Sequence, residues 1–196
     1  VWGLDVAIDV VFAPSGTDLE RVALALALSR SDRAVTKILL GQDEVGSGCV
    51  LAAAGQYFAG ETAVASGLCK GSRIAGFEEV ELLSLPVRDE NGAPVSSDWM
   101  TTAIGAVVEA VTDRGGAPLV HVVHGSKTGL VLPDLDGIDR LLAGFGDRLS
   151  IVVDACQARI EADRLHAYLD RQAIVLLTGS TFMGGPPFSG VALIPA

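Results

Sequence analysis

Five short polar segments hold most of the residues in this sequence that could do chemistry. Each follows an apolar run rich in Val, Ile and Leu, which is typical of a buried strand. In an open parallel sheet, ligands bind just beyond the carboxyl ends of the strands, near helix N-termini. The segments are therefore the places to look for a site, and they lie at 14–17, 41–48, 124–129, 154–157 and 178–181.

The segment at 14–17 leads directly into a helix-like run. The free N–H groups of a first helical turn, the helix dipole and the Thr17 hydroxyl can bind a phosphate, and Gly16 allows close approach. Ser15, Gly16 and Thr17 are equally a common helix cap, so both interpretations stay open. The dinucleotide fingerprint GxGxxG and the P-loop GxxxxGK[ST] are absent, which disfavours a nucleotide site.

Asp154 stands at the end of a nearly continuous apolar strand. A carboxylate in such a place needs a partner, because burying an unpaired charge is costly. One interpretation is structural: Asp154 caps the next helix or pairs with an arginine. The other is that Asp154 pairs with a protonated nitrogen of a ligand, which Gln157 would also contact.

The segment around 121–129 contains two histidines three residues apart. If the strand continues, His121 and His124 face opposite sides of it, and two histidines without a third ligand indicate no metal site. We expect His121 to be a core histidine with satisfied hydrogen bonds and Lys127 to be a solvated loop lysine. Lys127 is notable because the chain has only two other lysines, Lys37 and Lys70. No GxSxG motif occurs, which disfavours a hydrolase triad.

The composition of the 196 residues restricts the class of protein. A net charge of −10 argues against nucleic acid or an anionic membrane as partner, and no apolar run is long enough to span a bilayer. Cys49, Cys69 and Cys156 are scattered without a metal-binding pattern. We expect them to be reduced thiols of a cytoplasmic protein and to be buried as small apolar side chains.

Strand-like and helix-like segments alternate along the whole chain. This pattern predicts one α/β domain over 1–196, with a mostly parallel mixed sheet covered by helices on both faces in a three-layer arrangement. The chain opens without methionine, so we expect an excerpt of a longer protein. The expected strands are 4–13, 37–41, 78–87, 118–125, 149–155, 173–179 and 191–195, and the expected helices are 17–30, 46–59, 97–116, 135–146 and 161–171.

Four of these segments together resemble the large domain of pyridoxal-phosphate-dependent enzymes of fold type I. The similarity is greatest to the class V aminotransferase group, which includes cysteine desulfurases, kynureninase and alanine–glyoxylate aminotransferase. It rests on "SGT" at 15–17, "HGSKTGL" at 124–130, "VDACQ" at 153–157 and "TGSTFMGGPPFSG" at 178–190, in the family's order.

The resemblance implies pyridoxal phosphate as cofactor and a homodimer. It also implies an amino acid or amine substrate, processed through an external aldimine, and an excerpt that lacks the N-terminal arm and the small C-terminal domain. Asp154 would pair with the pyridine nitrogen and Gln157 would hydrogen-bond the phenolic oxygen of the ring. Ser126 would contact cofactor or substrate. The phosphate would be bound by Ser15, Gly16, Thr17, Thr178 and Ser180.

Two positions depart from the family pattern. Val45 or Gly46 falls where the family often stacks a histidine or aromatic side chain on the cofactor. Thr181 occupies the position of the Schiff-base lysine, and a threonine cannot form an imine.

Three explanations for Thr181 stay open. A modified lysine was lost when the sequence was written, or the lysine was replaced naturally, or Lys127 takes its place. The alternative to an enzyme is a non-catalytic relative that kept the fold as a binding or scaffold protein. An unrelated α/β phosphate-binding domain is a third possibility.

Overall fold

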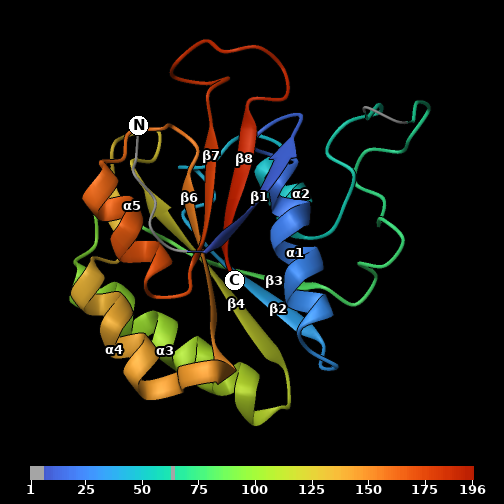
Figure 1. The fold of residues 1–196 in the computed structure, drawn as a ribbon. Coiled ribbons are helices and arrows are strands. Elements are labelled where there is room, and N and C mark those ends of the chain that lie inside the picture. The colour runs from blue at the N-terminus through green and yellow to red at the C-terminus, as the bar shows by residue number, and fades with distance from the viewer. Residues whose placement is uncertain (1–6, 63–64) are drawn as a thin grey trace.

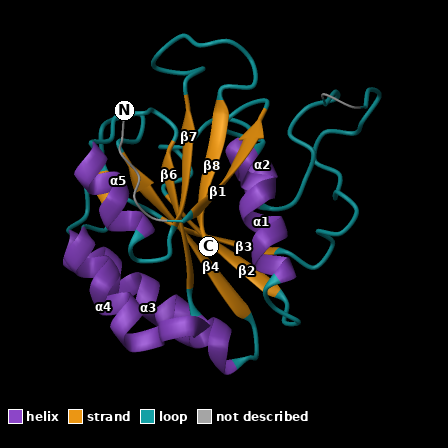
Figure 2. Cartoon of the chain, viewed as in Figure 1, coloured by secondary structure: helices purple, strands orange, loops and turns teal. Residues whose placement is uncertain are grey.

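The computed structural model describes residues 7–62 and 65–196, and these residues fold around one eight-stranded sheet. Helices cover both faces of the sheet, which gives three layers (Figure 1). The sheet is mixed but mostly parallel, so the fold class expected from the sequence is confirmed. Figure 2 shows that long loops gather above the strand ends and beside α1.

The strands run in the order β1-β8-β7-β6-β4-β2-β3, with β5 paired to β4. Neighbours from β3 to β7 are parallel, and β8 is antiparallel to both β7 and β1, so β1 points the same way as β7. The carboxyl ends of all strands except β5 and β8 therefore meet at one edge. The bounds are β1 Ile8–Ala13, β2 Val35–Leu40, β3 Glu81–Leu85, β4 Ala117–His124, β5 Val131–Leu132, β6 Ser150–Ala155, β7 Ile174–Thr178 and β8 Gly190–Pro195.

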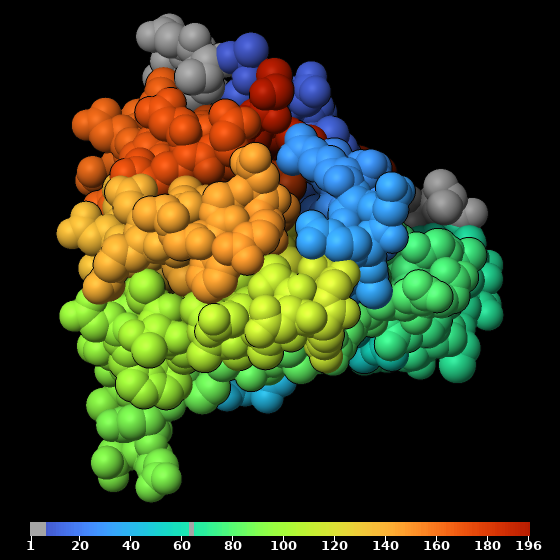
Figure 3. Space-filling model, turned by 90° about the horizontal axis from the view of Figure 1, so that it is seen from below, coloured from blue at the N-terminus to red at the C-terminus, as the bar shows by residue number. Residues whose placement is uncertain are grey.

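The helices divide between the two faces of the sheet. α1 (Leu19–Ser29) and α2 (Cys49–Ala53) contact each other on one face, and α3 (Ser97–Asp113), α4 (Leu135–Phe145) and α5 (Ala162–Leu169) cover the other. A short 3₁₀ helix, Gly146–Arg148, follows α4. The view from below shows the end of the molecule opposite the strand-end loops, where α3 and α4 pack side by side (Figure 3).

Two apolar clusters hold these layers together, one packed against α1 and one that includes the α3, α4 and α5 side chains. Leu119 and Val152 pack in the cluster that includes Leu24 of α1, whereas their neighbours Val120 and Val153 pack in the cluster with the α3, α4 and α5 side chains. This division follows from the alternation of side chains along a strand. Both faces of the central strands are buried, which explains their continuous Val/Ile/Leu runs.

The helix expected over 46–59 is much shorter in the structure. α2 ends at Ala53, because Gly55 takes a left-handed conformation with φ of 70° and turns the chain away. A Cβ at position 55 would lie 2.6 Å from the Phe77 side chain, so that turn also requires glycine. β5 was not expected, because a strand of two residues leaves no pattern in the sequence.

The strand expected over 4–13 is observed from Ile8, and its first residues fall partly outside the described ones. In the described part of the chain, no helix has the length and apolar character that crossing a membrane requires.

Gly190 fixes the distance between β8 and the turn after β1. A Cβ there would lie 2.8 Å from the Ser15 carbonyl oxygen and 3.0 Å from that of Ala13, both backbone atoms that cannot rotate away. We expect Gly190→Ala to lower the free energy of unfolding by about 1–3 kcal/mol, measured by urea denaturation. Gly144→Ala is the matched control, because a Cβ at that α4 position meets nothing within 4 Å. Equal stability of the two variants would contradict this close approach.

Candidate active site

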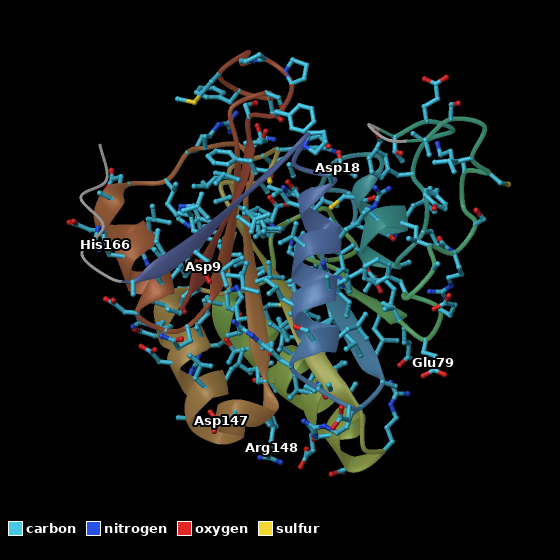
Figure 4. All side chains as sticks on the ribbon, turned by 45° about the vertical axis from the view of Figure 1, so that its right-hand side comes forward. Asp9, Asp18, Glu79, Asp147, Arg148 and His166 are labelled. Atoms are coloured by element: carbon cyan, nitrogen blue, oxygen red, sulfur yellow. The ribbon has the colours of Figure 1, made fainter. Side chains whose placement is uncertain are left out.

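A cavity of about 270 Å³ lies at the carboxyl edge of the sheet. It is bounded by the turns after β1, β2, β4, β6 and β7, the segments that the sequence singled out. Figure 4 places Asp18, at the start of α1, at this end of the molecule, and Asp147 and Arg148 at the other end. All nine site residues expected from the sequence line the cavity: Ser15, Gly16, Thr17, Ser126, Asp154, Gln157, Thr178, Ser180 and Thr181.

The turn before α1 presents backbone donors to this cavity. The Ser15 hydroxyl donates to Asp18 Oδ2 at 2.7 Å and accepts from the Asp18 N–H at 3.2 Å. Ser15 thus organises the turn, and Asp18, the residue directly before α1, makes no side-chain cap bond. Within the described residues, the backbone N–H groups of Gly16 and Thr17 have no hydrogen-bond acceptor. Two free donors at a helix N-terminus suit an anion.

Two hydroxyl groups face this turn from the end of β7. Thr178 Oγ1 lies 2.8 Å from Ser180 Oγ, and it accepts from the Ser180 N–H at 3.2 Å. A Cβ on Gly16 would lie 3.2 Å from the Thr178 methyl group and 3.0 Å from Cys156 Sγ, both closer than usual contacts, so a larger residue would force these side chains or the turn to shift. The N–H groups and the hydroxyls therefore bound the same part of the cavity.

Asp154 lies at the end of β6 with 15% of its side chain exposed to the cavity. Its Oδ1 accepts from the Cys156 N–H at 2.9 Å, and its Oδ2 lies 3.7 Å from His121 Nε2. Burial alone would raise the pKa of Asp154, but the hydrogen bonds and the charge of His121 outweigh it and lower this pKa below its usual value. Asp154 is thus a carboxylate able to accept from a protonated ligand nitrogen. No arginine among the described residues pairs with it, and α5 starts too late to be capped by it.

His121 and His124 face opposite sides of β4, as their spacing predicted. His124 Nδ1 lies 2.9 Å from the Tyr168 hydroxyl on the α5 face. His121 is fully buried on the α1 face, but the expectation that its hydrogen bonds are satisfied is wrong. Neither ring nitrogen makes a hydrogen bond of normal geometry, and each faces a carboxylate, Glu20 on one side and Asp154 on the other.

Glu44, which the sequence analysis did not select, joins the loops on the β2 and β4 side of the cavity. Its carboxylate accepts from the Ser126 hydroxyl at 2.7 Å, from the Thr128 N–H at 3.1 Å and from Arg88 at 2.8 Å. Burial would raise the pKa of Glu44, but these hydrogen bonds lower it to about 2. Ser126 is thereby held by Glu44, and it also accepts from the Leu130 N–H at 3.1 Å. The sequence "DE" after β2 gave no sign of which acid would turn inward.

Thr181, at the position of the family's lysine, is exposed at the rim of the cavity. Lys127 is the one lysine among the described residues that lines the cavity, and its Nζ donates to the Asp43 carbonyl at 3.3 Å. Lys127 is exposed, as expected of a loop lysine. Val45 and Gly46 also line the cavity, so the wall where the family often has an aromatic ring is aliphatic here.

The three cysteines are free thiols in different environments. Cys49 is buried and Cys156 is half-buried, and both line the cavity. Burial and the charges of Glu20 and Asp154 raise the pKa values of both thiols well above the usual range, so they stay protonated. Cys69 is exposed, and the expectation that it would be buried is wrong, because it lies in the long loop after α2.

One group of donor atoms has the spacing of a metal site. Glu20, His121 and Asp154 each place an atom within 4.8 Å of the others. The two carboxylates, however, face different nitrogens of the same ring, and the Lys37 ammonium already contacts Glu20. A single cation cannot lie on both sides of an imidazole ring, so we assign no metal ligand here.

Solved structures of known proteins contain the same arrangement of strands and helices. Mouse CSAD is 18% identical, with 98% of this chain and 38% of that chain covered and a TM-score of 0.61. The chain has the aspartate-aminotransferase-like fold. Aspartate aminotransferase from Trypanosoma cruzi matches at 15% identity, with 100% of this chain and 46% of that chain covered and a TM-score of 0.60. An aromatic-amino-acid aminotransferase from Burkholderia pseudomallei, covalently bound to pyridoxal phosphate, matches at 16% identity over 96% of this chain and 42% of that chain, with a TM-score of 0.61.

These neighbours are pyridoxal-phosphate-dependent enzymes of fold type I, including aminotransferases and decarboxylases. The chain spans less than half the length of each of the three. No protein-family model matches the sequence, and a search of curated proteins found no relative.

The hydrogen bonds that lower the pKa of Glu44 should also stabilise the folded protein, and the pH dependence of unfolding tests this. In the unfolded chain this carboxyl titrates near 4.5, against about 2 in the fold, so its contribution is complete above pH 4.5 and is lost as the pH falls toward 2. We expect Glu44→Gln to cost about 3 kcal/mol of unfolding free energy at pH 7 and progressively less at lower pH. Urea denaturation between pH 7 and pH 3 measures this difference.

The matched control for that measurement is Glu81→Gln. Glu81 also pairs with an arginine, Arg114, but 43% of its side chain is exposed. We expect only a small loss of stability from this variant, because exposed pairs contribute little. A cost for Glu44→Gln that does not change with pH would show that its carboxylate is not held in the charged form by these bonds.

Proposed function

We propose that this chain is the cofactor-binding large domain of a pyridoxal-phosphate-dependent enzyme that acts on an amino acid or amine. The observation that carries the proposal is the convergence of three features in one cavity. These are the free N–H groups of Gly16 and Thr17, the Thr178 and Ser180 hydroxyls, and the Asp154 carboxylate. The cavity lies at the carboxyl edge of a sheet whose fold is that of aminotransferases.

The phosphate end of the cofactor fits the turn before α1. Two backbone donors at a helix N-terminus and two hydroxyls supply hydrogen bonds to a dianion, and the helix dipole adds a favourable field. In a chain of net charge −10, such local donors are what an anion requires in order to bind. The free donors and the close approach at Gly16 therefore support phosphate binding at this place.

The pyridine end of the cofactor fits Asp154. Its carboxylate is charged, mostly buried and exposed toward the cavity, so it can hold a proton on a ring nitrogen. Gln157, also on the cavity wall, offers an amide to an oxygen of the ring. When bound, pyridoxal phosphate supplies an electron sink for bonds at the α-carbon of an amino acid.

Neither Thr181 nor Lys127 offers a free amine to which the cofactor could attach. Thr181 has no amine, and the Lys127 ammonium contacts the Asp43 carbonyl. We propose that this chain, with threonine at 181, binds the cofactor noncovalently, and that covalent attachment at this position would require a lysine. A non-catalytic relative that kept the fold would bind in the same noncovalent way, and turnover of an amino acid or amine by the wild-type chain separates the two.

The finer assignments are also proposals. The similarity of the four motifs supports the class V group. The structural neighbours include both aminotransferases and decarboxylases, so they do not favour one reaction. The domain pattern of the family supports a homodimer, because partner subunits often complete such sites. The chain spans less than half the length of these neighbours, and an N-terminal arm and a small domain in the whole protein are proposals from the family resemblance.

Replacing Gly16 tests the phosphate contact. We expect Gly16→Ala to weaken the uptake of pyridoxal phosphate at least about tenfold, because the added Cβ would push the turn away from Thr178 and Cys156. Equilibrium dialysis measures this, and Gly144→Ala is the control. Pyridoxal without the phosphate should bind both variants equally weakly. Wild-type protein that takes up no pyridoxal phosphate would overturn the proposed function.

Introducing a lysine at 181 tests the position of the attachment. With pyridoxal phosphate, we expect Thr181→Lys to acquire an absorbance band near the visible edge and a cofactor label that borohydride fixes on the peptide containing 181. Thr181→Arg keeps the positive charge but cannot form the bond, so it should remain unlabelled. Labelling of wild-type protein at Lys127 would instead show that the loop after β4 supplies the amine.

A further inference from the structure

Four charged or ionisable side chains form a continuous buried row behind Asp154. The Lys37 Nζ contacts Glu20 Oε2, Glu20 Oε1 lies 3.5 Å from His121 Nδ1, and His121 Nε2 lies 3.7 Å from Asp154 Oδ2. Lys37 and His121 are completely buried and Glu20 is 1% exposed. Only Asp154 reaches the cavity, so the row connects the cavity to the interior.

The sheet register explains why these residues meet. Leu39 of β2 pairs with His121 of β4, and His121 pairs with Val152 of β6. Lys37 lies two residues before Leu39, and Asp154 two residues after Val152, so all three polar side chains share the α1 face. The row therefore runs diagonally across β2, β4 and β6 toward the carboxyl edge of the sheet. Glu20 joins the row from α1.

The two carboxylates determine the protonation of His121. A neutral imidazole has one N–H donor and one nitrogen lone pair, and a lone pair facing a carboxylate is repelled. Each nitrogen of His121 faces a carboxylate oxygen and neither has another partner among the described residues. The pKa values of Glu20 and Asp154 are lowered, and with both acids charged the two nitrogens can be satisfied only if both carry protons.

The charge count leads to the same conclusion. With a charged His121, the row holds two cations and two anions and is neutral. With a neutral His121, it would hold one uncompensated negative charge in an apolar layer, which is costly. The other ionisable groups around the row are the Cys49 thiol, which donates to Glu20 at 2.9 Å, and the Cys156 thiol beside Asp154, and both are protonated.

We propose that Glu20 and Lys37 are positioning residues that hold His121 as an imidazolium, which in turn keeps Asp154 a carboxylate oriented at the cavity. The consequence for a ligand nitrogen rests on the proposed function, but the protonation of His121 does not. Neither Glu20 nor Lys37 touches the cavity. Their effect on Asp154 passes through His121.

The ¹⁵N chemical shifts of the histidine rings test this directly in the chain without cofactor. At pH 8 an ordinary histidine, with a pKa near 6.5, is roughly 97% neutral. We expect the His121 ring to be doubly protonated at this pH, with its signal identified by its loss in His121→Asn. A neutral ring in the wild-type protein would overturn the proposal.

Two variants then test the roles of Glu20 and Lys37. Glu20→Gln leaves Lys37 to balance Asp154, so we expect His121 to become neutral at pH 8. Adding Lys37→Met removes that excess cation, so in the double variant His121 should again be doubly protonated as the partner of Asp154. If Glu20 had only a structural role, removing Lys37 as well would not restore the double protonation of His121.

Glu81→Gln is the control, because it removes a paired carboxylate on β3 that is not part of the row. We expect no change at His121. A doubly protonated ring in Glu20→Gln, or a neutral ring in the double variant, would overturn the proposal. Failure of pyridoxal phosphate to bind would count against the proposed function alone, since the ring shifts are measured without it.

Discussion

Parallel strands place their last residues, and the first turns of the helices that follow them, at a single edge of the sheet. In this protein β8 reverses between β7 and β1, so that β1 also ends at that edge. The Ser15–Thr17 turn thereby comes next to Thr178, although 160 residues separate them in the chain. The cavity, its anion-binding turn and its carboxylate all depend on this alignment.

A second constraint acts inside the α1 face of the sheet. Charged groups in an apolar layer must compensate one another, and here they do so in a row that ends at the cavity. Glu44 uses the same principle on the other side of the cavity, where Arg88, Ser126 and Thr128 satisfy it. The two buried acids thus have different functions: Glu44 fixes the loops, and Glu20 belongs to the row behind Asp154.

The fold resembles that of enzymes that attach their cofactor to a lysine, whereas position 181 has a threonine without an amine. The arrangement of elements is that of solved pyridoxal-phosphate-dependent enzymes, and the cavity holds the donors and the carboxylate that the proposed function assigns to the phosphate and the pyridine nitrogen. Only the attachment point lacks its amine. In the proposed function, binding and attachment of the cofactor are therefore separate, because the donors at the turn before α1 do not depend on the residue at 181.

The sequence by itself determined the order of strands and helices along the chain, the mostly parallel character of the sheet and the segments that surround the cavity. It could do so because burial on both faces leaves continuous apolar runs, and because Gly16 and Asp154 interrupt them at strand ends. Only the tertiary structure decided the partners of the buried charges. Lys37 lies within a strand and Glu20 within a helix, and nothing local indicates that they meet. Their contact, and the place of His121 between two carboxylates, follow from the strand register and from the packing of α1, which are set by the whole sheet.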